Sequence, residues 1–203
     1  MNTETPYRPL QLLRTAALLL LVLIVLTGLA YPLAVTGIAQ LTMRDDANGS
    51  LVERDGVVVG SALIGQNFWG SSGYFWGRPS AAGSGYDANQ SGGANLGPSN
   101  PALVTRIEAS IAELRAANWE RGDSPIPVDL VTTSASGLDP HISPAAAEYQ
   151  APRIARERGL SEDQVLALVR AHTEGRWLWV FGEERVNVLE LNLALDALAP
   201  IGR

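Results

Sequence analysis

The sequence predicts an α+β protein with a single N-terminal transmembrane helix followed by one mixed helix and strand domain outside the cytoplasm. Residues 15–43 contain no charged side chain, and Leu, Val and Ile dominate from Ala16 to Leu41. About 20 apolar residues suffice for a helix to cross ~30 Å of hydrocarbon. Beyond this run, helical and strand patterns follow one another without regular βαβ alternation, which favours the α+β class.

Three interpretations compete for the apolar run: a membrane anchor, a cleaved signal peptide and a buried core helix. The small residues of Gly28-Leu29-Ala30 have the spacing of a cleavage site. However, the apolar run continues past that point to Leu41. A buried core helix is usually shorter. We therefore predict a membrane anchor.

The residues that flank the run indicate its orientation. Arg8 and Arg14 precede it, whereas Arg44 is followed at once by two Asp residues. Basic residues mark the cytoplasmic side of a span. We expect residues 1–14 to form a cytoplasmic tail, 15–43 the transmembrane helix, and 44–203 a soluble extracytoplasmic domain. The chain would then be a single-pass protein of the cell (inner) membrane.

Small residues and a proline give the predicted anchor two further features. Thr27, Ala30, Ala34 and Gly37 recur at helical spacing, and such a face lets another helix approach closely in lipid. Pro32 cannot donate a backbone hydrogen bond, which predicts a kink. Because the span holds no ionisable group, it cannot form an ion path by itself. We expect this helix to pack against partners.

Composition excludes several function classes. The formal net charge is −6, which argues against nucleic acid as a partner. All 15 basic residues are Arg, so a phosphate-loop lysine and a Schiff-base lysine are both excluded. The chain also has no Cys, which excludes disulfides and thiol nucleophiles.

The strand and loop patterns of the soluble part are short. Asp55-Gly56 between apolar runs predicts a hairpin of residues 51–53 and 57–63. Residues 128–133 form a further strand candidate, and 177–181 with 185–189 predict a second hairpin. The stretch 83–100 is rich in Gly, Ser and Asn. Such a long loop is usually functional or disordered.

Helix signals are clearer. Asn100-Pro101 and Ser143-Pro144 each pair a capping residue with Pro at the first helical position. The first predicted helix ends by Gly122. The second is predicted to bend or break at Pro152 and to end at Gly159. Residues 161–164 form a capping box for a third helix, and Leu191, Leu195 and Leu198 predict a short closing helix.

Ser134, Ser136, Asp139 and His141 lie within eight residues of one another. They suggest a hydrolase triad or, more simply, a polar loop between two elements. The nucleophile motif G-x-S-x-G is absent, and triads usually draw their members from distant positions. We therefore favour the polar loop and expect no catalytic residue.

Metal and anion sites receive equally little support. The only histidines, His141 and His172, do not have paired metal-ligand spacing. We expect His172 to be a core residue and no metal to bind. Arg153, Arg156 and Arg158 are interpreted as a solvated helix face.

Several segments together resemble one known family. The segments include 60–68, 78–81, 91–96, 127–132, 134–139 and 186–196, in that order. Within them the resemblance rests on Gln66, Phe68, Arg78, Pro79, Ser80, Ser91, Gly92, Gly93, Asn95, Ser134, Ser136, Gly137, Asp139, Asn187 and Asn192. The chain resembles the C subunit, the KdpC family, of the Kdp potassium-transporting P-type ATPase. It departs from the family pattern at Ala94 and Glu184.

The resemblance implies an accessory, non-catalytic subunit of the high-affinity ATP-driven potassium uptake complex. Its partners would be a potassium channel-like subunit and a P-type ATPase subunit that hydrolyses ATP, together with the lipid bilayer. It also implies a catalytic chaperone that raises the ATP affinity of the pump subunit. The residues themselves indicate no cofactor, and ATP enters by resemblance only. The alternative functions are a membrane-anchored extracytoplasmic Ser hydrolase using Ser136, Asp139 and His141, and a binding module for a polar ligand.

Overall fold

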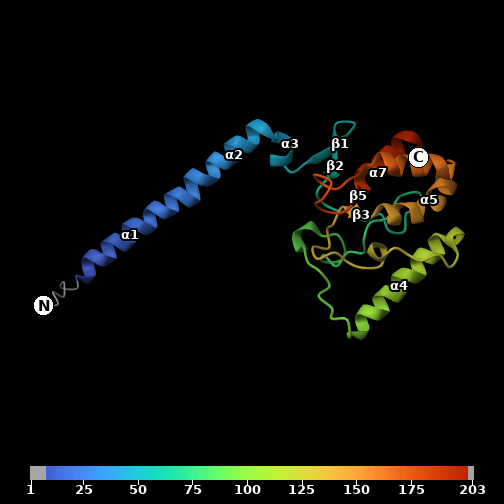
Figure 1. Ribbon diagram of the computed structural model, residues 1–203, viewed down its shortest axis with the longest axis horizontal. Helices are drawn as coiled ribbons and strands as arrows, with labels where there is room; N and C mark the ends of the chain where they lie inside the picture. Colours follow the sequence, from blue (N-terminus) through green and yellow to red (C-terminus); the bar gives the residue numbers. More distant parts are fainter. Residues whose placement is uncertain (1–7, 201–203) are drawn as a thin grey trace. The chain divides into compact units, whose positions relative to one another are not determined.

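The computed structural model describes residues 8–200, in two units that meet between Ser50 and Leu51 (Figure 1). The first unit is helical throughout most of its length. It comprises α1 (Pro9–Val25), a π-helical turn (Leu26–Ala30), α2 (Tyr31–Thr42) and the short α3 (Arg44–Ala47). The stretch Pro9–Thr42 is long and apolar enough to cross a membrane. This helix begins before residue 15, and residues 1–7 of the predicted tail lie outside the described residues.

A π turn lies immediately before Pro32. The amide of Tyr31 donates to the carbonyl of Leu26, five residues back, rather than to the usual fourth. Such turns accommodate the gap that proline leaves in the helical hydrogen-bond ladder, because proline has no backbone amide hydrogen to donate. The π turn also changes the register between Thr27 and the residues that follow Pro32. Ala34 and Gly37 share the uninterrupted helix α2 and therefore one face.

The second unit begins with a hairpin of β1 (Leu51–Arg54) and β2 (Val57–Ser61). The two strands are antiparallel, with Leu51 opposite Ser61. Asp55 and Gly56 both have positive φ, at 52° and 76°, as a tight two-residue turn requires. The predicted first hairpin is therefore confirmed.

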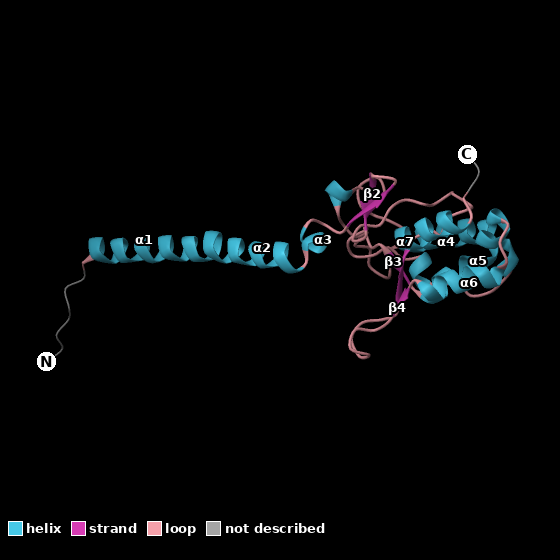
Figure 2. Cartoon of the chain, turned by 90° about the horizontal axis from the view of Figure 1, so that it is seen from above, coloured by secondary structure: helices cyan, strands magenta, loops and turns pink. Residues whose placement is uncertain are grey.

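The rest of this unit is a set of helices beside a small sheet (Figure 2). The sheet is antiparallel, in the order β3 (His141–Ile142), β5 (Arg185–Asn187) and β4 (Thr173–Glu174). The helices are α4 (Pro101–Ala117), α5 (Pro144–Arg158), α6 (Glu162–Ala171) and α7 (Val188–Leu198). Mixed helix and strand after an N-terminal apolar helix is the fold class that the sequence predicts.

The predicted helix ends are confirmed. Asn100 and Ser143 accept backbone hydrogen bonds as N-caps, and Ser161 forms the capping box with Gln164. Gly159 ends α5 in the left-handed conformation, with φ of 65°. These signals are local, so they survive in the folded chain.

Two predicted strands are wrong. Residues 128–133 do not form a strand; Val128–Leu130 is a 3-10 helix, and the Thr132 hydroxyl donates back to the Val128 carbonyl at 2.8 Å. In the second predicted hairpin, β5 pairs with Thr173–Glu174 instead of residues 177–181. Trp177 and Phe181 make only an isolated bridge.

Pro152 does not interrupt α5. It leaves the carbonyl of Glu148 without its usual helical donor. The guanidinium of Arg121 donates to this carbonyl and also, at 3.0 Å, to that of Tyr149. A side chain from outside the helix therefore supplies the bond that proline removes.

The core lies between α5, α6, α7 and the segment that precedes α4. Helix α5 packs on α6, and α6 on α7. Their buried side chains include Ile154, Val165 and Leu191, and Phe75 is fully buried among the core residues. Ala146, Ala147 and Ala151 on α5 are also fully buried, so its backbone can approach its neighbours closely.

The predicted solvated Arg face is wrong for two of its three residues, because only Arg156 is exposed. Arg153 is completely buried, and the side chain of Arg158 is only 1% exposed. The Arg153 guanidinium donates to Asn118 Oδ1 at 3.0 Å, to the Tyr74 carbonyl at 2.9 Å and to the Ser72 carbonyl. It also lies over the Trp76 ring, 4.6 Å from the centroid. Burial lowers the pKa of Arg153 to about 10, and the group remains charged at neutral pH.

His172 is also not a core residue. It is the half-buried C-cap of α6, and its Nδ1 lies 2.9 Å from the Leu168 carbonyl oxygen. Its position at the helix end, rather than on the apolar face, explains the difference.

We predict that Arg153→Met destabilises the full-length chain by at least about 3 kcal/mol, because each buried acceptor left without its donor costs about 1–3 kcal/mol. The exposed Arg170 of α6 provides the control, and Arg170→Met should cost less than about 0.5 kcal/mol. Urea unfolding in detergent, followed by tryptophan fluorescence, measures both. Equal losses for the two variants would contradict this role of Arg153.

Candidate functional site

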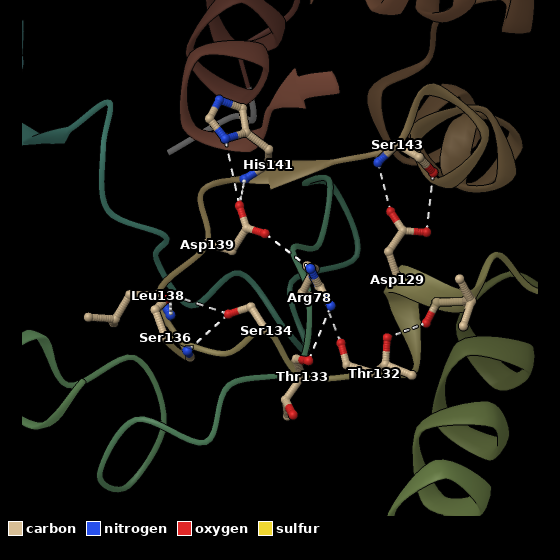
Figure 3. Close-up of polar contacts among 12 residues, drawn as sticks. Arg78, Asp129, Thr132, Thr133, Ser134, Ser136, Leu138, Asp139, His141 and Ser143 are labelled. Atoms are coloured by element: carbon tan, nitrogen blue, oxygen red, sulfur yellow. Dashed lines mark hydrogen bonds and ion pairs between the residues drawn. The ribbon is translucent and has the colours of Figure 1, made fainter. Parts of the chain in front are cut away.

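The motif residues converge on one polar segment, residues 127–143, which we call the motif loop (Figure 3). Arg78 fastens it from a distant part of the chain. The guanidinium donates to the carbonyls of Thr132 and Thr133, at 3.4 and 3.1 Å, and to Asp139 Oδ2 at 3.1 Å. A single planar group thereby holds two separate points of the loop.

Ser134 and Ser136 of the motif loop shape a turn. Ser134 Oγ accepts from the Gly137 amide at 2.9 Å, and Ser136 Oγ accepts from the Leu138 amide at 3.1 Å. Gly137 has φ of 67°, and a Cβ at this position would lie 2.6 Å from the Gly92 carbonyl oxygen. Only glycine combines this conformation with such a close approach.

The Gly-rich stretch packs against that turn. The amide of Gly92 and the hydroxyl of Ser91 both donate to the Ser136 carbonyl, at 2.8 and 3.0 Å. A Cβ on Gly93 would lie 2.9 Å from the Ala135 carbonyl oxygen. This part of the loop is therefore a packing partner of the motif loop. Asn95, with φ of 50°, lines a neighbouring pocket of about 240 Å³.

The remaining motif residues brace neighbouring segments. Ser80 Oγ donates to the Gly137 carbonyl at 2.6 Å, and Gln66 Nε2 donates to the Val59 carbonyl at 2.9 Å.

Two asparagines act at helix α7. Asn187 caps α7 and donates to the Ala62 carbonyl at 2.7 Å. Asn192 bonds the amide and the carbonyl of Phe75, at 2.8 and 3.0 Å. Phe68 stacks near Tyr74, and Pro79 is half-buried beside Arg78.

Asp139 is an ion-pair and turn residue. Its Oδ1 accepts from the His141 amide at 3.0 Å and lies 3.6 Å from His141 Nδ1. Burial raises the pKa of Asp139, but hydrogen bonds from His141 and Arg78 outweigh this effect, so its pKa lies below the ordinary 3.8. The carboxylate is therefore held in its charged form.

The serine–histidine relay of a hydrolase is not formed. Within residues 8–200 neither Ser134 nor Ser136 makes a hydrogen bond to His141; their hydroxyl oxygens accept from the amides of Gly137 and Leu138 in their own turn. No group of three or more potential metal ligands occurs in the described part of the chain.

A cleft of about 760 Å³ opens beside the motif loop. One wall carries Arg78, Asp129, Asp139 and His141, and the other is made by Gly175, Trp177 and residues 181–185. Asp129 is fixed by the amide and hydroxyl of Ser143, at 2.7 and 3.2 Å. Sequence reasoning missed this cleft, because its aromatic wall was assigned to a regular hairpin.

The apolar helix offers a second surface. Along α1, the π turn and α2 there is no buried residue among those described. Ala30, Ala34 and Gly37 are exposed there, and a Cβ on Gly37 would meet nothing within 4 Å. The predicted packing role of this face, Thr27 included, stays a prediction.

Comparison with known families identifies the chain. The family model described as "KdpC: K+-transporting ATPase, c chain" matches residues 13–197. The chain belongs to the KdpC family. This confirms the family resemblance that the motif residues indicate.

Named relatives in the KdpC family match along nearly their whole length. A potassium-transporting ATPase KdpC subunit of Polaromonas naphthalenivorans is 60% identical over 94% of this chain and 96% of its own. That of Koribacter versatilis is 54% identical over 92% of this chain and 95% of its own. That of Sorangium cellulosum is 59% identical over 91% and 96%. In this member of the KdpC family, most motif residues hold loops together.

We predict that Asp139→Asn destabilises the chain by about 1–2 kcal/mol at about pH 7, because it removes a charged hydrogen-bond acceptor. Since the folded-state pKa is lowered, this stabilisation is complete above about pH 4 and is lost as the pH falls through the folded-state value. The difference from the native chain should therefore shrink at about pH 3.

Urea unfolding at the two pH values tests this prediction. Asp123→Asn is the control, because the Asp123 side chain is fully exposed, and it should change stability by less than about 0.5 kcal/mol. A deficit of Asp139→Asn that stayed constant with pH would contradict the ion-pair role.

Proposed function

We propose that this chain is an accessory, non-catalytic subunit of a potassium-transporting ATPase that stabilises its assembly. Its partners are a channel-like subunit that carries potassium and a P-type subunit that hydrolyses ATP. Membership of the KdpC family supports this role. The observation that carries the assembly role is the Pro9–Thr42 helix, which buries none of its described residues within its own chain. A membrane helix of this kind gains packing only from other chains or lipid.

The proposed topology places the N-terminus in the cytoplasm and residues 44–203 outside the cell (inner) membrane. Arg8 and Arg14 before the span support this orientation. The helix Pro9–Thr42 contains one charged residue, Arg14, near its N-terminal end. The potassium path therefore belongs to the channel-like partner.

A finer part of the proposal concerns ATP. We propose that the chain acts as a catalytic chaperone that raises the ATP affinity of the pump subunit. The chain has no Lys and no phosphate loop, so any effect on ATP passes through contact with the pump subunit. An extracytoplasmic domain also faces away from cytoplasmic ATP, which makes the membrane helix the route of this contact.

We predict that Ala34→Leu reduces recovery of the two partners with the affinity-purified chain at least several-fold. A larger side chain on the small-residue face keeps a partner helix from approaching closely. Thr36→Leu introduces the same residue on the opposite face of α2, and it should leave recovery near that of the native chain. Mass spectrometry of complexes purified in mild detergent measures both. Equal recovery would show that this face is not the interface.

We predict that purified full-length chain lowers the KM for ATP of the purified pump subunit when the two are mixed, whereas the chain alone binds no fluorescent ATP analogue. Direct nucleotide binding by the chain would contradict an effect through contact. An unchanged KM in a mixture that co-purifies would refute the chaperone role but leave the assembly role intact.

A further inference from the structure

Residues 177–181, which we call the apolar tip, expose five consecutive large hydrophobic side chains. The exposed fractions are 70% for Trp177, 60% for Leu178, 93% for Trp179, 70% for Val180 and 60% for Phe181. Figure 2 shows the loop that follows β4 projecting away from the rest of the domain. Isolated exposed hydrophobic residues are ordinary, but a contiguous group of this size marks an interaction surface.

The backbone of the apolar tip has an unfavourable conformation. Leu178 and Trp179 both have positive φ, at 50° and 67°. Two backbone hydrogen bonds between Trp177 and Phe181, at 2.8 and 2.9 Å, close the two ends of this loop. Turns of this form favour Asn and Gly at the central positions. Large apolar residues at these positions weaken the turn, and they are better explained by a contact that the tip makes elsewhere.

Ion pairs neutralise the base of the apolar tip. Arg176 Nη2 lies 2.6 Å from Glu183 Oε2, and Arg185 Nε lies 2.9 Å from Glu174 Oε2. The tip itself carries no charged side chain. It can therefore enter an apolar environment without burying an unpaired charge. The near balance of charge at its base also gives it no preference for an anionic surface.

The membrane that holds the anchor lies within reach of this domain. Residues 43–50 connect the apolar helix to β1, and an extended chain spans at most about 3.6 Å per residue. The connection is therefore shorter than about 30 Å, less than the diameter of a domain of this size. Tryptophan favours the boundary between water and hydrocarbon. A protruding tip also fits a deformable lipid surface better than a flat protein face.

We propose that the apolar tip inserts into the interfacial layer of the bilayer, on the side of the membrane where the domain lies. The domain is then attached to the membrane twice, through its anchor and through the tip. This inference rests on the membrane anchoring in the proposed function and is independent of the partner subunits. Two attachments limit rotation of the domain about the short connection.

The absence of Cys permits a direct test by single labelling. Val180 lies in the tip, whereas Val128 lines the cleft, and both are 70% exposed. We expect a fluorophore on full-length Val180→Cys, in phosphatidylcholine vesicles, to emit at shorter wavelength than on Val128→Cys. Lipids that carry a quencher near the headgroup should quench it at least twofold more strongly. Adding Trp179→Ser should return the Val180→Cys signal to the level of Val128→Cys.

The outcomes separate the possible occupants of the apolar tip. Equal quenching at the two positions overturns the proposal. In the complete complex, a Val180→Cys label shielded from both water and quencher lipid identifies a partner protein as the occupant, and this also overturns it. Vesicle flotation tests the anchoring separately. A chain that does not float refutes the anchor, whereas a floating chain with an unquenched label refutes only the role of the tip.

Discussion

The buried guanidinium of Arg153 is the constraint on which the soluble domain depends. Taking a charged group out of water is costly unless its donors are satisfied. Here the compensation comes from carbonyl and amide oxygens, with Gln150 Oε1 at 2.7 Å in addition to the acceptors on residues 71–74 and Asn118. The Trp76 face adds a cation–π contact. Two segments far apart in the sequence, residues 71–76 and the one at Asn118, are thereby held on α5.

Buried side chains also supply backbone hydrogen bonds to the long segment between β2 and α4. Only the 3-10 turn Ala88–Gln90 interrupts its irregular backbone among the described residues. Buried amides and carbonyls without strand or helix partners still need hydrogen bonds. Asn192 satisfies both groups of Phe75, and Gln150 satisfies both groups of Trp76, at 2.8 and 3.1 Å. Side-chain amides thus make the backbone hydrogen bonds that a neighbouring strand would otherwise make.

Arginine serves the same purpose at three further positions. Arg78, Arg121 and Arg158 each donate to two backbone carbonyls, those of residues 132 and 133, 148 and 149, and 73 and 199, respectively. A planar fork with five donors suits two adjacent acceptors better than the single ammonium of Lys. The composition, all Arg and no Lys, is consistent with this bracing, although surface Arg residues are not explained by it.

How much of this the sequence could predict depended on the range of the interaction. Capping by Asn100, Ser143 and Ser161 was predictable because each cap acts within one turn. A break at Pro152 and a solvated Arg153 are not found, because both positions depend on remote partners, Arg121 and the segment at residues 71–74. In the site, the motif residues were found but their long-range contacts were not, since those of Ser80 with Gly137 and of Ser91 with Ser136 each cross more than 40 positions. The apolar tip was visible as a hydrophobic run but was mistaken for a strand, because a buried strand and an exposed loop can have the same apolar composition.

The tip differs from the motif loop in the number of side-chain hydrogen bonds that hold it. The motif loop is held by Arg78 and the Gly-rich stretch, whereas the described side-chain bonds at the tip's base are exposed ion pairs, so the tip can change conformation at much smaller cost than the motif loop.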